Sequence, residues 1–137
     1  MTGSPQAAPF VITCRGRVLC AQCTVARTSR QRLRGLIGRP LPAGGGLLIV
    51  PCASVHTAFM RRAIDVVFLD RAGCVLRVVP ALGPWRVVAC RGSRAVLELP
   101  AGTCTAVGVA AGVTLRSAGA ELPGRRNGWA GRSGRPR

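Results

Sequence analysis

Hydrophobic residues along this chain come in short runs separated by glycine, proline or charged residues. Their alternation and their content of β-branched residues predict strands at residues 10–14, 18–26, 46–51, 64–70, 74–80, 85–90, 95–100 and 113–117. Along 64–70, Ile64, Val66 and Phe68 should share one face of a strand, with Asp65, Val67 and Leu69 on the other. The pattern indicates a chain built mainly from β-strands.

The turns between these runs predict two hairpins. Asp70 and Gly73 occupy the first and last positions of a good type I turn, which would join 64–70 to 74–80. Residues 91–93 would join 85–90 to 95–100 in the same way. Residues 52–63 have no clear period, so we expect them to be irregular.

One helix is predicted at about residues 28–38, TSRQRLRGLIG. Thr28 and Gln31 have the spacing of a capping box, and Leu33, Leu36 and Ile37 form one apolar stripe. Gly38 and Pro40 suit the end of a helix. Thr103 could begin a further helical turn that ends at Gly108.

These elements predict a mainly β fold, either a small sandwich or a partly closed barrel with one short helix. Residues 10–117 would form a single domain after a flexible lead-in at 1–9. Residues 118–137 are rich in arginine and glycine and too poor in apolar residues to form a core, so we expect a disordered basic tail.

The net charge of +16 comes entirely from arginine, because the chain has no lysine. These arginines are spread along the sequence and only 4% of residues are aromatic, a pattern that favours weak, nonspecific polyanion binding over specific nucleic-acid recognition. Seven cysteines, an odd number, do not suit a secreted disulfide framework. The N-terminus lacks the pattern of a secretion signal and no apolar run is long enough to span a membrane, so we expect a cytoplasmic protein.

Several stretches resemble one bacterial and archaeal family, the domain of unknown function 192. They are VARTSRQRLRGLIGR (25–39), GGLLIVPCASVHTAFMRRAIDVVFLDRAGCVLRVV (45–79), PWR (84–86) and AVLELPAG (95–102). The resemblance implies a compact, mainly β domain whose short helix carries the GL-x-GR segment, and it implies no established reaction. Many relatives carry an export signal. This chain departs from the family at Gly112-Val113, where relatives usually have Gly-Asp.

Cysteine and methionine offer two weak metal hypotheses. Cys20 and Cys23 lie three apart within a predicted strand, so their sulfurs should point to opposite faces and serve packing. Cys52, His56 and Met60 have side chains that suit copper(I) or zinc, but Pro51 argues against the helix that would align them. We therefore expect no cofactor.

A polar cluster around His56 is the best candidate site. His56, Thr57 and Asp65 would gather at the entrance to a strand, bordered by Arg39 and Arg86, whose guanidinium groups suit a small anionic ligand or a partner protein. The favoured function is thus a non-enzymatic binding domain. The alternatives are a hydrolase or transferase that uses His56 with Asp65 or Glu98, and an arginine-driven polyanion binder.

For the two acids a structural role is the simpler interpretation. Asp65 could accept backbone N–H bonds or pair with an arginine, and Glu98, in the middle of a strand, would need a partner such as Arg86 or Arg39. Trp85 is more typical of a core or rim residue than of a pocket.

Overall fold

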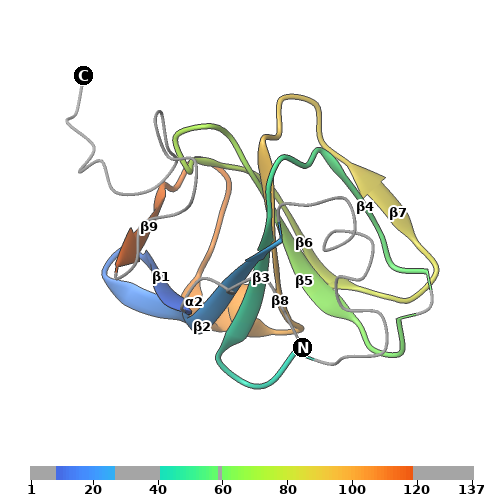
Figure 1. Cartoon of the computed structure of the whole chain (residues 1–137), viewed down its shortest axis with the longest axis horizontal. Coiled ribbons are helices and arrows are strands. Elements are labelled where there is room, and N and C mark those ends of the chain that lie inside the picture. Colours follow the sequence, from blue (N-terminus) through green and yellow to red (C-terminus); the bar gives the residue numbers. More distant parts are fainter. Residues whose placement is uncertain (1–8, 27–40, 59, 119–137) are drawn as a thin grey trace, which may run out of the picture.

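The structure, a computed structural model, describes residues 9–26, 41–58 and 60–118 (Figure 1). The predicted helix at 28–38, the tail from 119 and Arg39 lie outside the described residues, as do residues 1–8 of the lead-in. The strands are β1 (Phe10–Cys14), β2 (Arg17–Ala26), β3 (Gly45–Ile49), β4 (Ser54–His56), β5 (Ile64–Leu69), β6 (Val75–Leu82), β7 (Val87–Ala89), β8 (Ala95–Pro100) and β9 (Leu115–Ala118), and helix α2 spans Thr103–Val107.

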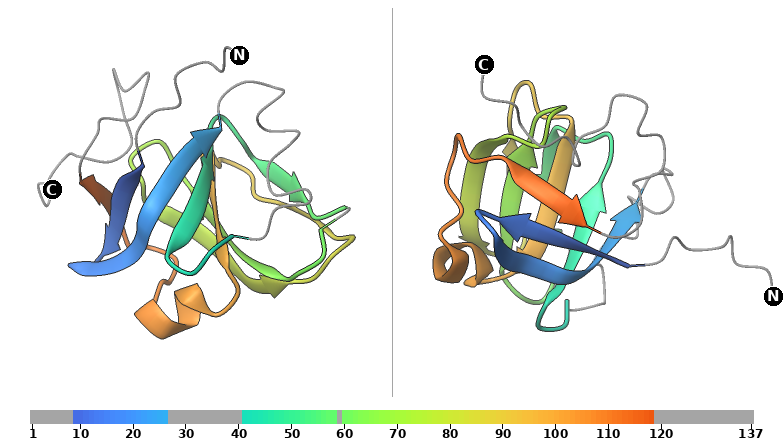
Figure 2. Two further views of the ribbon diagram at one scale, coloured as in Figure 1. Left: turned by 60° about the horizontal axis from the view of Figure 1, so that its bottom comes forward. Right: turned by 90° about the vertical axis from the view of Figure 1, so that its left-hand side faces the viewer.

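Seven strands form one sheet in the order β6-β5-β8-β3-β2-β1-β9, and β4 and β7 form a separate two-stranded ribbon. All neighbouring pairs in the large sheet are antiparallel except β2 and β3, which are parallel. The large sheet curls into a half-barrel, with α2 at one end (Figure 2). The prediction of a mainly β fold is confirmed.

Strand alternation divides the apolar residues into cores on the two sides of the large sheet. Val67, Leu69 and Leu97 belong to the cluster that also includes Cys104 of α2. Val66 and Phe68 belong to a second cluster, which Val55 of β4 joins from the ribbon. The predicted two-faced alternation of residues 64–69 is therefore confirmed.

The first predicted hairpin is correct and the second is wrong. Between β5 and β6 the Gly73 N–H donates to the Asp70 carbonyl at 3.1 Å, as a type I turn requires. In contrast, β7 pairs with β4 and β8 lies between β5 and β3. All but the last residue of β8 are buried, which suits a central strand. In β7, by contrast, the first and last residues, Val87 and Ala89, are exposed.

The expectation that 52–63 is wholly irregular is also wrong, because β4 forms there. It has only three residues, too few for a period to be visible in the sequence. The turn predicted from Thr103 to Gly108 is confirmed as helix α2, which ends at Gly108 in a left-handed conformation (φ 86°).

The prediction that Cys20 and Cys23 point to opposite faces is wrong. Their Cα partners on β1 are Ile12 and Phe10, so three residue steps on β2 oppose two on β1. This is a β-bulge, and the N–H groups of both intervening residues, Ala21 and Gln22, donate to the Gly44 carbonyl at 3.0 Å. The additional residue in β2 places the Cys23 side chain on the same side of the sheet as that of Cys20. Both cysteines are fully buried in one core cluster.

Candidate functional site

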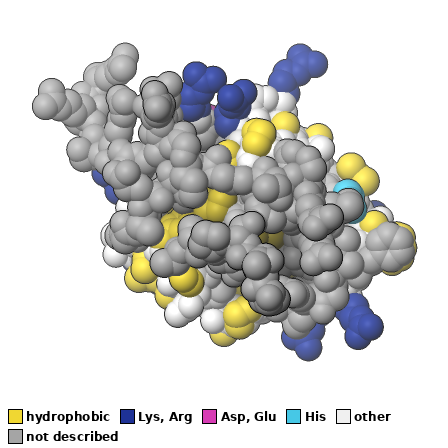
Figure 3. Space-filling view, viewed as in Figure 1, with side chains coloured by type: hydrophobic (Ala, Val, Ile, Leu, Met, Phe, Trp, Pro, Cys, Tyr) yellow, Lys and Arg dark blue, Asp and Glu magenta, His cyan; other side chains and the backbone are white. Residues whose placement is uncertain are grey.

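The outer face of the β4–β7 ribbon carries the single histidine. His56 lies directly opposite Val87, and its alternation with buried Val55 turns the imidazole away from the core. The flanking pairs, Val55 with Val88 and Thr57 with Arg86, are in hydrogen-bonding positions, since the Thr57 N–H donates to the Arg86 carbonyl at 2.8 Å. His56 and Val87 are therefore a non-hydrogen-bonded pair, in which side chains approach most closely. Figure 3 shows His56 at the surface beside hydrophobic side chains.

Thr57 is fully buried and fixes the chain that leads into β7. Its hydroxyl donates to the Gly83 carbonyl at 2.6 Å and accepts from the Arg86 N–H at 2.9 Å. Its own carbonyl accepts from the Trp85 N–H at 3.0 Å. A single threonine therefore holds three positions of the segment 83–86. The sequence predicts Thr57 as a ligand-binding residue, but in the structure it is buried and positions the exposed residues of this segment.

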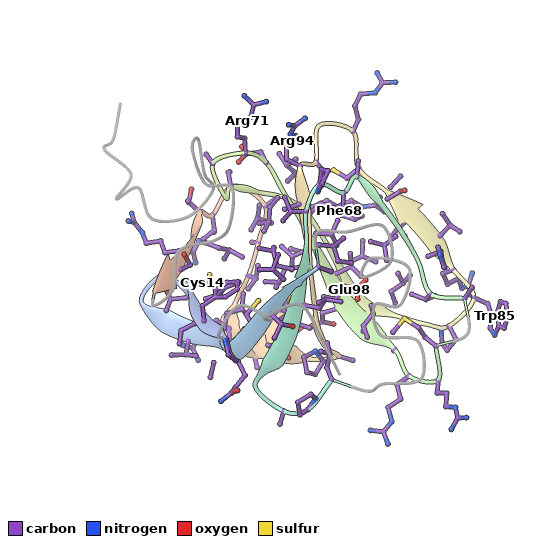
Figure 4. The ribbon with its side chains drawn as sticks, viewed as in Figure 1. Cys14, Phe68, Arg71, Trp85, Arg94 and Glu98 are labelled. Carbon is purple, nitrogen blue, oxygen red and sulfur yellow. The ribbon has the colours of Figure 1, made fainter. Side chains whose placement is uncertain are left out.

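Trp85, in the segment that Thr57 holds, combines an unusual backbone conformation with an exposed side chain. Its backbone is left-handed (φ 62°), which is uncommon for a bulky residue, while its side chain is 65% exposed. Figure 4 shows it beyond the ends of β4 and β7, pointing away from the large sheet. Val87, which is 75% exposed and lies opposite His56, adds a second exposed apolar side chain two positions along the chain. We call Ser54, His56, Trp85, Arg86, Val87 and Ala89 the ribbon face.

The charges on the described surface are mainly positive. Every arginine that the structure describes is exposed. Among the three described acidic residues, Asp65 and Glu98 are buried. Asp70 is half-buried, and its Oδ1 accepts the N–H groups of Ala72 at 2.8 Å and Cys74 at 2.9 Å. The described part of the surface therefore carries mainly positive charge, and Arg77 brings part of it to the ribbon by donating to the Ala89 carbonyl at 3.1 Å.

Asp65 does not join His56. Its Oδ1 accepts the Ala81 N–H and its Oδ2 accepts the Cys104 N–H, both at 2.8 Å. Ala81 lies at a bulge of β6 with a positive φ of 48°, and Cys104 lies in the first turn of α2. The carboxylate thus caps a helix and secures a strained strand, which agrees with the structural role that the sequence suggested.

Glu98 lies on the opposite face of the sheet from Asp65. It is only 4% exposed and its Cα partner on β3 is Leu47. Burial raises the pKa of Glu98 to about 7. No group among the described residues forms a hydrogen bond or ion pair with its carboxyl; of the two arginines predicted as partners, Arg86 is exposed and Arg39 lies outside the described residues.

The enzymatic and metal alternatives draw on residues that the described structure keeps apart. His56 faces outward from the ribbon, Glu98 lies behind the ribbon, and Asp65 lies beyond the large sheet. The Cys52 thiol donates to the Ser54 carbonyl at 3.0 Å and Met60 packs against the second core cluster. Within the described ranges, no three His, Cys, Asp or Glu side chains are grouped closely enough to hold a metal ion.

The predicted site includes His56 and Arg86 of the ribbon face but leaves out its exposed apolar members, Trp85 and Val87. The hydrophobic pattern predicts both residues within a strand at 85–90 that pairs with 95–100. The signal that could have found them is the run Gly83-Pro84-Trp85, where turn residues precede an aromatic residue that a short edge strand cannot bury.

The comparisons with known proteins concern nearly the whole described domain. Residues 10–117 match the family DUF192, described as an uncharacterised ACR family. A protein from Thermococcus sibiricus called UPF0127 protein is 33% identical over 94 residues, which are 64% of this chain and 60% of that protein. The alignment thus spans less than two thirds of the length of this curated relative.

Two solved structures have the same fold. A protein of unknown function from Novosphingobium aromaticivorans matches with a TM-score of 0.70 at 22% identity, over 79% of this chain and 83% of that one. A protein from Sinorhizobium meliloti described as a putative transcription regulator matches with a TM-score of 0.72 at 23% identity, over 85% and 98% of the two chains. Among the described helices none is long and apolar enough to cross a bilayer.

Proposed function

The chain belongs to the DUF192 family, and we propose that it acts within that fold as a non-enzymatic module that binds an acidic segment of a partner protein on the ribbon face. The observation that carries the proposal is the exposed Trp85, held in a left-handed conformation by the buried Thr57. A bulky residue in this region costs of order 1–3 kcal/mol, and such strain is concentrated at binding and catalytic sites.

The composition of the ribbon face suits a protein partner. Tryptophan and arginine are the residues most enriched at binding hot spots, and here Trp85 and Arg86 are adjacent. Val87 adds exposed apolar area beside them, and His56 lies across from it on β4. A face with an apolar centre and a charged border has the anatomy of a protein interface.

The positive charge of the described surface favours an acidic partner. Arg86 belongs to the ribbon face, Arg77 donates to the Ala89 carbonyl there at 3.1 Å, and no carboxylate among the described residues is fully exposed, so an acidic polypeptide would meet complementary charge. Arg86 would pair with a carboxylate, and an apolar side chain of the partner would pack on Trp85. A nucleic acid would be attracted by the same charges, but the described surface offers one exposed large aromatic residue for base stacking.

Fluorescence anisotropy with three labelled probes of equal charge tests the proposal: an acidic peptide that contains leucine and valine, poly-glutamate, and duplex DNA. We expect the mixed acidic and apolar peptide to bind most tightly. Trp85→Ala should weaken its binding by about tenfold or more, as expected for a hot spot. Val87→Ser should weaken it to a smaller extent.

Val18 offers a matched control, since it is a valine of β2 with 56% exposure, remote in sequence from the ribbon. Val18→Ser should leave peptide binding unchanged. Equal affinities of the wild type and of Trp85→Ala for the peptide would refute the proposal, provided that both unfold at the same temperature. Tightest binding to duplex DNA, with loss on salt addition and none on Trp85→Ala, would favour the polyanion reading instead.

A further inference from the structure

The bulge in β2 creates a pair of neighbouring thiols in the core. Cys20 and Cys23 oppose residues of β1 that are only two apart, so their Cα atoms are separated by about two strand rises, roughly 6.6 Å. Disulfide bonds in proteins join Cα atoms roughly 4.4–6.8 Å apart. The bulge therefore brings this pair just inside the range in which two cysteines can be bridged.

The two thiols also influence each other within one core cluster. Their interaction lowers the pKa of Cys20 and raises the pKa of Cys23, whose thiol donates to the Thr24 carbonyl at 3.7 Å. One sulfur is thus the better nucleophile and the other retains its proton, which is the asymmetry that stepwise oxidation of a dithiol uses.

The surroundings of the pair are closely packed. Neither cysteine is exposed, and a Cβ atom at Gly46 would lie 2.6 Å from the Cys20 sulfur. The sulfur of Cys20 therefore occupies space that only a glycine on β3 leaves open. Because both sulfurs are buried among the described residues, we expect hydrogen peroxide, which is uncharged and little larger than water, to reach them more readily than a bulky or charged oxidant.

We propose that Cys20 and Cys23 form an oxidation site that hydrogen peroxide converts reversibly to a disulfide. The Cys20 thiolate attacks one peroxide oxygen and the O–O bond breaks; the departing hydroxide takes up the proton that Cys20 released and leaves as water. The Cys23 sulfur then displaces the hydroxyl of the resulting sulfenic acid: the S–S bond forms, the S–O bond breaks, and the hydroxide leaves with the Cys23 proton as a second water. The two thiols supply two electrons, which reduce the peroxide.

The product should be easily reduced. A bridge at the upper end of the allowed Cα separation is strained, and strained disulfides have more oxidising potentials than relaxed structural ones. A small thiol reductant should therefore restore both thiols once the strand opens locally. This inference concerns β2 and the core, and it is independent of the ribbon face.

Tryptic peptide mapping tests the proposal directly. Cleavage after Arg17 and Arg27 releases VLCAQCTVAR, which contains both cysteines and no others. After peroxide treatment of the folded full chain and alkylation of free thiols, this peptide should be unalkylated and lighter than the reduced peptide by two hydrogen atoms. Dithiothreitol should restore double alkylation.

Two controls make the result decisive. Cys14 and Cys104 are buried in the same core cluster and lie in other tryptic peptides, and they should stay reduced while the first pair is oxidised. In Cys23→Ser, the peptide should carry a trapped sulfenic acid on Cys20. The proposal is overturned if VLCAQCTVAR keeps both thiols while exposed sulfurs are oxidised, or if oxidised glutathione produces the disulfide as fast as peroxide does.

Discussion

Glu98 lies directly opposite Val66 on the neighbouring strand β5. Val66 belongs to the apolar cluster beneath the ribbon, so a carboxyl group shares this face with hydrophobic side chains. Burial without a charged partner among the described residues is the reason that its pKa is raised to about 7.

This placement predicts a stability that falls as the pH rises. The unfolded chain ionises Glu98 near its ordinary pKa of 4.5, whereas the folded chain keeps the proton until about pH 7. Between these two values the folded state binds more protons, so the free energy of unfolding should fall by at most about 3 kcal/mol and then level off. Urea unfolding at a series of pH values measures this. Glu98→Gln should remove the slope, and an unchanged slope in that variant would show that another group is responsible.

The two bonds of the Asp65 carboxylate predict a large effect of a small change. Each oxygen of the Asp65 carboxylate accepts one backbone N–H. In Asp65→Asn an NH₂ group replaces one of these oxygens, so two hydrogen-bond donors would face each other at that position. We expect a loss of about 2–4 kcal/mol in the free energy of unfolding. Asp70→Asn is the matched control, because Oδ1 alone accepts both N–H bonds there and an asparagine keeps it. Similar losses in the two variants would contradict the helix-capping role of Asp65.

The hydroxyl of Thr57 should determine the order of the ribbon. Thr57→Val keeps the shape of the side chain but removes the bonds to Gly83 and Arg86, leaving the Arg86 N–H without its partner. We expect a loss of about 1–3 kcal/mol and faster hydrogen exchange at Arg86 and Trp85. Thr57→Ser retains the hydroxyl and should preserve slow exchange. Exchange rates in the valine variant equal to those of the wild type would show that the Thr57 hydroxyl does not hold residues 83–86 in place.

Gly46 should tolerate no side chain. Gly46→Ala places a Cβ atom 2.6 Å from the Cys20 sulfur and 3.1 Å from Leu99 Cδ2, so we expect a loss of about 1–3 kcal/mol in unfolding free energy. Gly83→Ala, where nothing lies within 4 Å of the added carbon, should be close to neutral. Adding Cys20→Ala to Gly46→Ala should recover part of the loss. A double variant less stable than the sum of the two single changes would show that the sulfur is not the obstacle.

The sequence predicts long strands well and short ones poorly. β1 and β8 match their predicted bounds, because alternation and turn residues act over neighbouring positions. β4 is too short to show a period, and its pairing with β7 depends on the whole sheet. The bulge at Ala21 and Gln22 depends on a carbonyl of Gly44, more than twenty positions away, so no local pattern could reveal it.

The candidate site was predicted in part. The sequence predicts His56 and Thr57 together as polar neighbours in one site. Adjacent residues of an extended chain face opposite ways, and only the position of β4 shows that Thr57 is the buried one. For Asp65 the sequence favours a structural role, and the two backbone N–H bonds to its carboxylate confirm it. Whether the ribbon face binds a partner stays a prediction.

The pairing of β1 with β9 has a consequence for protein engineering. Val11 and Ala118 are Cα partners, so the chain enters and leaves the domain at neighbouring points on one sheet edge. Such a domain can be inserted as a cassette into a loop of a host protein without stretching it. It can also be circularly permuted, with the exposed turn at Arg71 and Ala72 as the place for the new ends.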